Sequence, residues 1–124
     1  MKTSQDPRHL KRVQAVQELF AWEFSSENKP KSDLAIETVK HLSEIDEQIK
    51  KAALAWPINQ INKVDLSILR LAVFELIIKK DAPIKVIVDE AVELAKEYGS
   101  ELSPSFINGV LGSLITLNNL EKNE

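Results

Sequence analysis

The segment from Val64 to Lys80 constrains the fold of this 124-residue chain more than any other part of it. A helix over this segment would be apolar on nearly every side, and such a helix belongs in the middle of a bundle. Glycine is scarce, whereas Leu, Ile, Ala, Glu and Lys are abundant, which favours an all-α fold. The apolar positions are Leu66, Ile68, Leu69, Leu71, Ala72, Val73, Phe74, Leu76, Ile77 and Ile78.

Two charged residues, Arg70 and Glu75, interrupt this apolar segment. An unpaired charge in a protein core is very costly, so each of them needs a partner of opposite sign. Glu90, which lies in the next expected helix, is the predicted partner of Arg70. We interpret these charges as core ion pairs that fix the register of the helices rather than as catalytic groups.

The N-terminal part of the chain predicts a helix from near Pro7 to about Phe24, with Asp6 as its N-cap. Apolar residues at helical spacing predict which side of this helix is buried. The predicted buried stripe is Leu10, Val13, Val16, Phe20 and Phe24, with Leu19 alongside.

The remaining helices have clear start and stop signals. Ser32 is predicted to cap one helix that runs as far as Trp56 and Pro57. Pro83 begins a helix that Gly99 ends, and Ser103 starts the last one. Five substantial helices with short connections therefore predict a compact helical bundle.

Several functional classes find no support in the sequence. Without cysteine there is no disulfide framework, thiolate zinc site or cysteine nucleophile. His9 and His41 have no ligand-like spacing, and the chain has neither a phosphate-binding loop nor a dinucleotide fingerprint. No apolar run is long enough to span a membrane, and no signal peptide is present. We therefore expect a cytoplasmic protein that is not an enzyme and has no metal or cofactor.

The charges are distributed unevenly along the chain. Lys2, Arg8, Lys11 and Arg12, against Asp6, give the first 12 residues a net charge of +3, although the whole chain carries −3. The three cations of the first helix are expected on the face away from its buried stripe. A basic arm on an acidic body suggests one surface for an anion and another for a basic partner. An ordinary solvated terminus is the alternative.

Single-stranded RNA is bound by such cations together with an aromatic ring on which an unpaired base stacks. His9 adds a planar ring to the basic arm, and Phe106, in the first turn of the last helix, is the candidate aromatic residue. Backbone N–H groups at that helix start favour a phosphate. The alternative is that Phe106 belongs to the core. We interpret Asn108 and Gly109 as scaffold, with Gly109 allowing close approach of a neighbouring helix.

Three segments, VDLSILRLAVFEL, PIKVIVDEAVELAKEYG and SPSFINGVL, resemble the signature segments of the bacterial NusB family of transcription antitermination factors. The segment RHLKRVQAVQELFAWEF is similar to that family's first helix. The resemblance implies an all-α bundle of two packed helical sub-bundles with about five to seven helices. It also implies one domain over residues 1–124, with a basic N-terminal arm at 1–12.

The resemblance further implies a function. NusB proteins bind the single-stranded boxA element of nascent RNA together with the ribosomal protein NusE. The resulting complex with RNA polymerase promotes transcription of ribosomal RNA. Family members are found as monomers and as homodimers, so the resemblance leaves a homodimer open. A helical protein-interaction module of the same fold, without RNA binding of its own, is the alternative function.

The family's binding residues map onto particular positions of this sequence. For contact with the NusE partner, the resemblance assigns Asp65 and Asn59. Leu102 departs from the family pattern, because relatives often have an acidic residue at this position. The loop at 25–31 also departs from it, since it is short where relatives have an additional helix. For RNA binding, the resemblance assigns Lys2, Arg8, His9, Lys11, Arg12 and Phe106.

Overall fold

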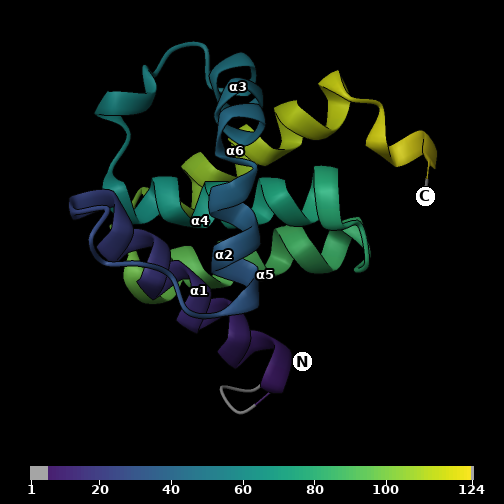
Figure 1. Ribbon diagram of the computed structural model, residues 1–124. Coiled ribbons are helices and arrows are strands. Elements are labelled where there is room, and N and C mark those ends of the chain that lie inside the picture. The colour runs from purple at the N-terminus through teal and green to yellow at the C-terminus, as the bar shows by residue number, and fades with distance from the viewer. Residues whose placement is uncertain (1–5, 124) are drawn as a thin grey trace.

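The computed structural model describes residues 6–123, and this part of the chain contains six α-helices and no strand (Figure 1). The prediction of an all-α fold is therefore confirmed. None of the described helices is both long and apolar enough to cross a membrane. The α-helices are α1 (Pro7–Phe24), α2 (Asp33–Lys40), α3 (Leu42–Ala52), α4 (Lys63–Val73), α5 (Ile84–Tyr98) and α6 (Ser103–Leu117). Three shorter helical segments are η1 (Ile58–Gln60), η2 (Phe74–Lys79) and η3 (Leu120–Asn123).

Helix α4 lies at the centre of the bundle, as predicted from its apolar sequence. It packs against each of the other five α-helices, and every residue from 65 to 73 is buried. Figure 1 shows α4 crossing the middle of the molecule. Asn62 caps this helix, because its side-chain oxygen accepts hydrogen bonds from the N–H groups of Val64 and Asp65 at 2.8 and 3.4 Å.

The predicted helix from Val64 to Lys80 changes its winding half way along. From Phe74 to Lys79 the chain forms the π-helix η2. The N–H group of Lys80 donates to the carbonyl oxygen of Glu75, five residues earlier, at 2.9 Å. Lys80 ends the segment in the left-handed conformation, with φ at 55°. The extra residue in this turn shifts the side chains that follow around the helix axis.

The prediction of one continuous helix after Ser32 is wrong, because the chain breaks at His41 into α2 and α3. The Nδ1 atom of His41 hydrogen bonds with the carbonyl oxygen of Glu37 at 2.9 Å. That oxygen would accept the backbone N–H of His41 in an uninterrupted α-helix. The backbone N–H of His41 instead reaches the carbonyl oxygen of Thr38 at 3.2 Å, and α2 ends there.

Helix α1 buries only part of the predicted stripe. Leu10 is 49% exposed and Phe24 is 61% exposed, although both were expected in the core. The buried residues of α1 include Val16 and Leu19, as predicted, and two polar side chains whose partners are described below. The buried residues are His9, Arg12, Ala15, Val16 and Leu19.

Two glycines play opposite roles around α6. A Cβ atom at Gly99 would lie 2.5 Å from Ser103 Oγ, so the corner between α5 and α6 requires glycine there. A Cβ atom at Gly109 would meet nothing within 4 Å. The interpretation that Gly109 permits a close helix contact is therefore wrong, and this residue lies on the surface.

Candidate functional site

Five titratable side chains connect α1, η2 and α5, and we call them the α1–α5 network: His9, Arg12, Glu75, Glu90 and Glu97. Arg12 donates through Nε and Nη2 to the two carboxylate oxygens of Glu75, both at 2.8 Å, and through Nη1 to Glu90 at 3.3 Å. His9 Nδ1 lies 3.0 Å from Glu90, and His9 Nε2 lies 3.3 Å from Glu97. All except the partly exposed Glu97 are buried.

The carboxylates of this network determine which face of α1 turns inward. Glu75 and Glu90 are 4% and 1% exposed, so they need cationic partners inside the protein. The hydrogen bond with Glu90 is the main factor that raises the pKa of His9 above its ordinary value. The expectation that Arg12 lies on the outer face of α1 is wrong for this reason.

The second core ion pair also differs from the prediction. Arg70 donates through Nε and Nη2 to both carboxylate oxygens of Asp46, each at 3.0 Å, and through Nη1 to Glu23. Glu90, the predicted partner of Arg70, belongs to the α1–α5 network instead. Arg70 therefore joins α4 to the C-terminal part of α1 and to α3.

Arg8 and Lys11 are the predicted arm cations that the structure places in solvent. The Arg8 side chain is 82% exposed, and its ion pair with Asp6 is long, at 3.5 Å. Asp6 accepts the backbone N–H of Arg8 at 2.9 Å and so caps α1 as predicted. Lys2 lies outside the described residues. The exposed charge on the first turns of α1 therefore comes from Arg8 and Lys11.

Phe106 is partly buried and packs against the core, on the first turn of α6. Its ring centre lies 6.3 Å from that of Trp56, and the two ring planes meet at 84°. Trp56 itself is 51% exposed. At this end of α6 the more accessible aromatic ring thus belongs to Trp56, which the sequence reasoning had treated only as a helix end.

Asp65 and Asn59, the predicted contacts for a partner, differ in exposure. Asn59 is exposed on η1, whereas Asp65 is 7% exposed near the start of α4. Burial raises the pKa of Asp65, and a hydrogen bond with Ser103 at the start of α6 opposes that effect. Among the side chains that the structure describes, Asp65 Oδ1 is the one buried polar atom without a hydrogen-bond partner.

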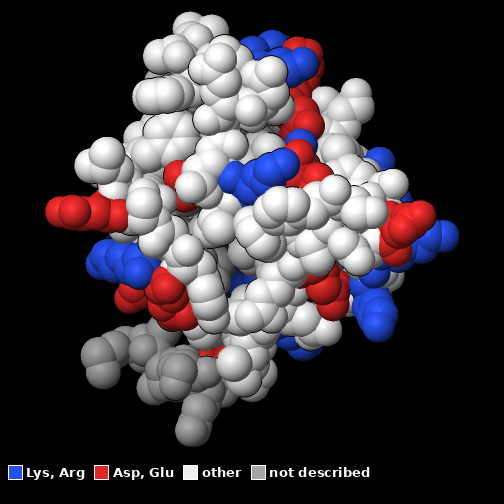
Figure 2. Space-filling view, turned by 90° about the vertical axis from the view of Figure 1, so that its left-hand side faces the viewer, with Lys and Arg blue, Asp and Glu red and all other residues white. Residues whose placement is uncertain are grey.

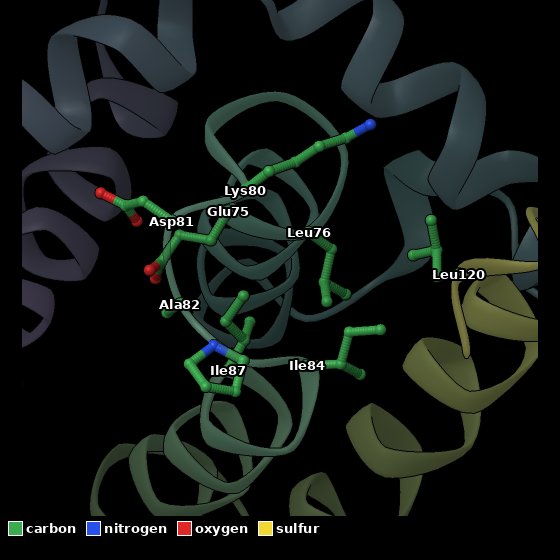
Figure 3. Close-up of a pocket in the computed structure, with 9 residues that line it drawn as sticks. Glu75, Leu76, Lys80, Asp81, Ala82, Ile84, Ile87 and Leu120 are labelled. Carbon is green, nitrogen blue, oxygen red and sulfur yellow. The ribbon is translucent and has the colours of Figure 1, made fainter. Parts of the chain in front are cut away.

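The ends of the molecule differ in shape and charge. Figure 2 shows the side on which η1 lies; its upper left part is uncharged, and charges of both signs are scattered over the rest. A pocket of about 520 Å³ lies at the other end of α4, between η2, the start of α5 and Leu120. In Figure 3 the side chains of Leu76, Ile84 and Leu120 face this hollow. Of the predicted binding residues, none lines it.

Residues 31–116 match the sequence model of the NusB family. The chain belongs to the NusB family. The transcription antitermination protein NusB of Dehalococcoides mccartyi is 53% identical over 76 residues, which cover 61% of this chain and 53% of the relative. The chain thus spans about half the length of the curated NusB relative that it matches.

Solved NusB structures share the fold. T. maritima NusB superposes with a TM-score of 0.77 at 35% identity, covering 94% of this chain and 93% of that one. A crystal structure of the antitermination factors NusB and NusE in complex with dsRNA matches with a TM-score of 0.72 at 28% identity. That match covers 90% of this chain and 99% of the matched chain.

The site combines residues that the NusB resemblance found with residues that it missed. Only the three-dimensional structure shows that Glu75 and Glu90 hold residues of the basic arm. The sequence contains one signal for this role: each is an acidic residue within an apolar stripe and therefore needs a cationic partner. Within the described part of the chain, no group of three or more His, Asp or Glu side chains is arranged so that it could hold a metal ion. The candidate site has the chemistry of a binding surface, because it combines exposed cations, an aromatic pair and a buried carboxylate.

Proposed function

We propose that this chain is an antitermination factor that binds boxA-type single-stranded RNA together with a NusE-type ribosomal protein, without enzymatic activity. The observation that carries the proposal is the α1–α5 network. It fixes the start of α1 on α5 and leaves Arg8 and Lys11 in solvent, where they can contact phosphates. The structural likeness to a NusB that assembles with NusE and RNA supports the same function.

The predicted RNA-binding residues then take two roles. Arg8 and Lys11, with Lys2 ahead of them, contact phosphates, which gives an affinity that falls as salt rises. His9 and Arg12 hold α1 in position and do not contact the RNA, because their side chains are buried and paired with carboxylates. Phe106 contributes to the surface on which bases stack.

The acidic body of the chain offers a second surface for the NusE-type partner. Asp65 Oδ1 is buried and has no hydrogen-bond donor within the described part of the chain, so a cationic or amide group of a partner would satisfy it. Asn59 is exposed on η1, close in sequence to α4. We extend the proposal to a place in an RNA polymerase antitermination complex in the cytoplasm, with residues 1–124 acting as one unit.

A titration of labelled boxA RNA, with and without the NusE-type protein, tests this function. We expect saturable binding that tightens when the partner is present. Each phosphate contact removed by Arg8→Ala or Lys11→Ala should flatten the slope of log affinity against log salt by about 0.7 for single-stranded RNA. The matched control is Lys40→Ala, an exposed cation at the end of α2. Equal slopes for all three variants would contradict the assignment.

The burial of His9 and Arg12 favours one alternative, a protein-interaction module of the same fold without its own RNA binding, because it leaves fewer free cations. In that case the NusE-type partner would bind while boxA RNA would not, even with the partner present. Light scattering of the free protein would show whether a homodimer covers the surface and competes with either ligand.

A further inference from the structure

Trp56 is held on the surface in a defined position by the turn between α3 and η1. Its backbone N–H donates to the carbonyl oxygen of Ala53 at 3.0 Å. Pro57 follows it directly, and the carbonyl oxygen of Pro57 accepts the N–H of Gln60 at 2.9 Å. Proline fixes the backbone angle φ at this point, so the turn has little freedom. An exposed aromatic ring on such a turn has already lost part of the entropy that binding would cost.

The contact with Phe106 fixes the indole ring without covering it. The two rings meet almost perpendicularly, at 84°, so they do not stack face to face. About half of the Trp56 surface, 51%, remains exposed, whereas Phe106 packs partly into the core. Phe106 therefore serves as the support for the ring, and Trp56 provides the open aromatic surface.

Polar groups next to Trp56 suit the edges of nucleic-acid bases. Asn59 and Gln60, three and four residues later, are exposed on η1 and make no side-chain hydrogen bond with the described part of the chain. Each amide carries both donors and an acceptor, the combination that pairs with base edges. The segment 52–62, which contains Trp56 and η1, has no charged residue, so its surface suits the bases of a strand rather than its phosphates.

We propose that Trp56, supported by Phe106, is a stacking platform for an unpaired RNA base, with the amides of Asn59 and Gln60 available to its edge. This inference rests on the proposed RNA-binding function and assigns the main stacking role to a residue outside the predicted site. It divides the binding energy between two regions: cations on α1 for the phosphates, and the turn after α3 for a base. A protein partner on the same apolar surface is the competing occupant.

The test uses the full chain with boxA RNA, alone and with the NusE-type partner. Trp56→Ala is expected to weaken RNA binding roughly 5-fold to 150-fold, which corresponds to about 1–3 kcal/mol for one stacked base. Trp56→Phe should retain most of the affinity, because any aromatic face can stack. The slope of log affinity against log salt should stay unchanged in both variants, unlike the effect of losing a phosphate contact.

The neighbouring Leu54 provides the matched control, since it is 88% exposed on the same turn. Leu54→Ala should leave RNA affinity unchanged. In the Trp22→Phe variant, Trp56 is the single tryptophan, and its fluorescence should be quenched as RNA binds. Fluorescence reports the stacking directly, even if Trp56→Ala folds poorly.

The outcomes separate the two levels of the proposal. If the unmodified protein binds no RNA in either form, the RNA-binding function and this inference both fail. If RNA binds with full affinity to Trp56→Ala and without quenching in Trp22→Phe, only the role of Trp56 is overturned. Loss of NusE binding in Trp56→Ala, with RNA affinity intact, would assign this surface to a protein partner instead.

Discussion

Replacing Arg12 with alanine should destabilise the fold far more than replacing its exposed neighbour Lys11. The Arg12→Ala variant leaves Glu75, which is 4% exposed, without the two hydrogen bonds of 2.8 Å that compensate its charge. Removing one partner of a buried ion pair costs about 3–5 kcal/mol. For a chain of this size we convert this to a melting temperature lower by roughly 10–20 °C. Lys11→Ala should change stability by no more than about 0.5 kcal/mol.

Urea unfolding followed by circular dichroism measures both variants under the same conditions. A second variant separates the lost ion pair from lost packing: Arg12→Met combined with Glu75→Leu removes both charges and keeps the volume filled. We expect this double variant to recover most of the stability, because a buried ion pair is often replaceable by apolar side chains. If Arg12→Ala is as stable as Lys11→Ala and flattens the salt dependence of RNA binding, Arg12 contacts phosphate and the buried-network argument is wrong.

Three further predictions concern single positions. The raised pKa of His9 means that its stabilising contribution is full below about pH 6.5 and is lost as pH rises through the folded-state pKa. In urea unfolding, His9→Gln should therefore cost more stability in mild acid than in alkali. An equal cost at both pH values would exclude a charged His9. Because burial raises the pKa of Asp65, its charge opposes folding near neutral pH. Asp65→Asn should therefore raise the melting temperature near neutral pH and have no such effect in strong acid. A change in melting temperature that does not depend on pH would indicate a packing effect instead. Gly109→Ala should stabilise α6 by about 1 kcal/mol, while Gly99→Ala, whose Cβ would meet Ser103, should destabilise the protein; thermal melts showing the same sign for both would contradict this contrast.

Local signals predicted the start and end of most helices. Asp6 and Ser32 cap their helices through hydrogen bonds that span only two or three residues, so the sequence contains both partners. Glycine at position 99, where α5 ends, also has a local reason, because a Cβ atom there would meet Ser103 four residues later. The central position of α4 followed from its apolar surface alone. These features depend on neighbours within a few residues.

The features that sequence reasoning missed depend on distant or competing partners. Arg12 turns inward because of Glu75 and Glu90, which lie 63 and 78 residues away. His41 breaks a helix whose apolar spacing is continuous, because its ring takes a carbonyl that the backbone would otherwise use. The position of the Trp56 ring depends on its contact with Phe106, which follows 50 residues later in the sequence. Periodicity carries no information about such contacts.

The long sequence separation within the α1–α5 network also has a consequence for synthesis of the protein on the ribosome. A chain emerges from its N-terminus, so the basic arm leaves the ribosome well before Glu75 and Glu90 do. Until α5 has emerged, His9 and Arg12 have no buried carboxylates to pair with and α1 has no fixed place. The nascent arm therefore exposes one more permanent cation than the mature one, Arg12, together with the His9 ring, and both are accessible to ribosomal RNA. Folding of the later helices withdraws Arg12 and His9 and leaves Arg8 and Lys11 exposed.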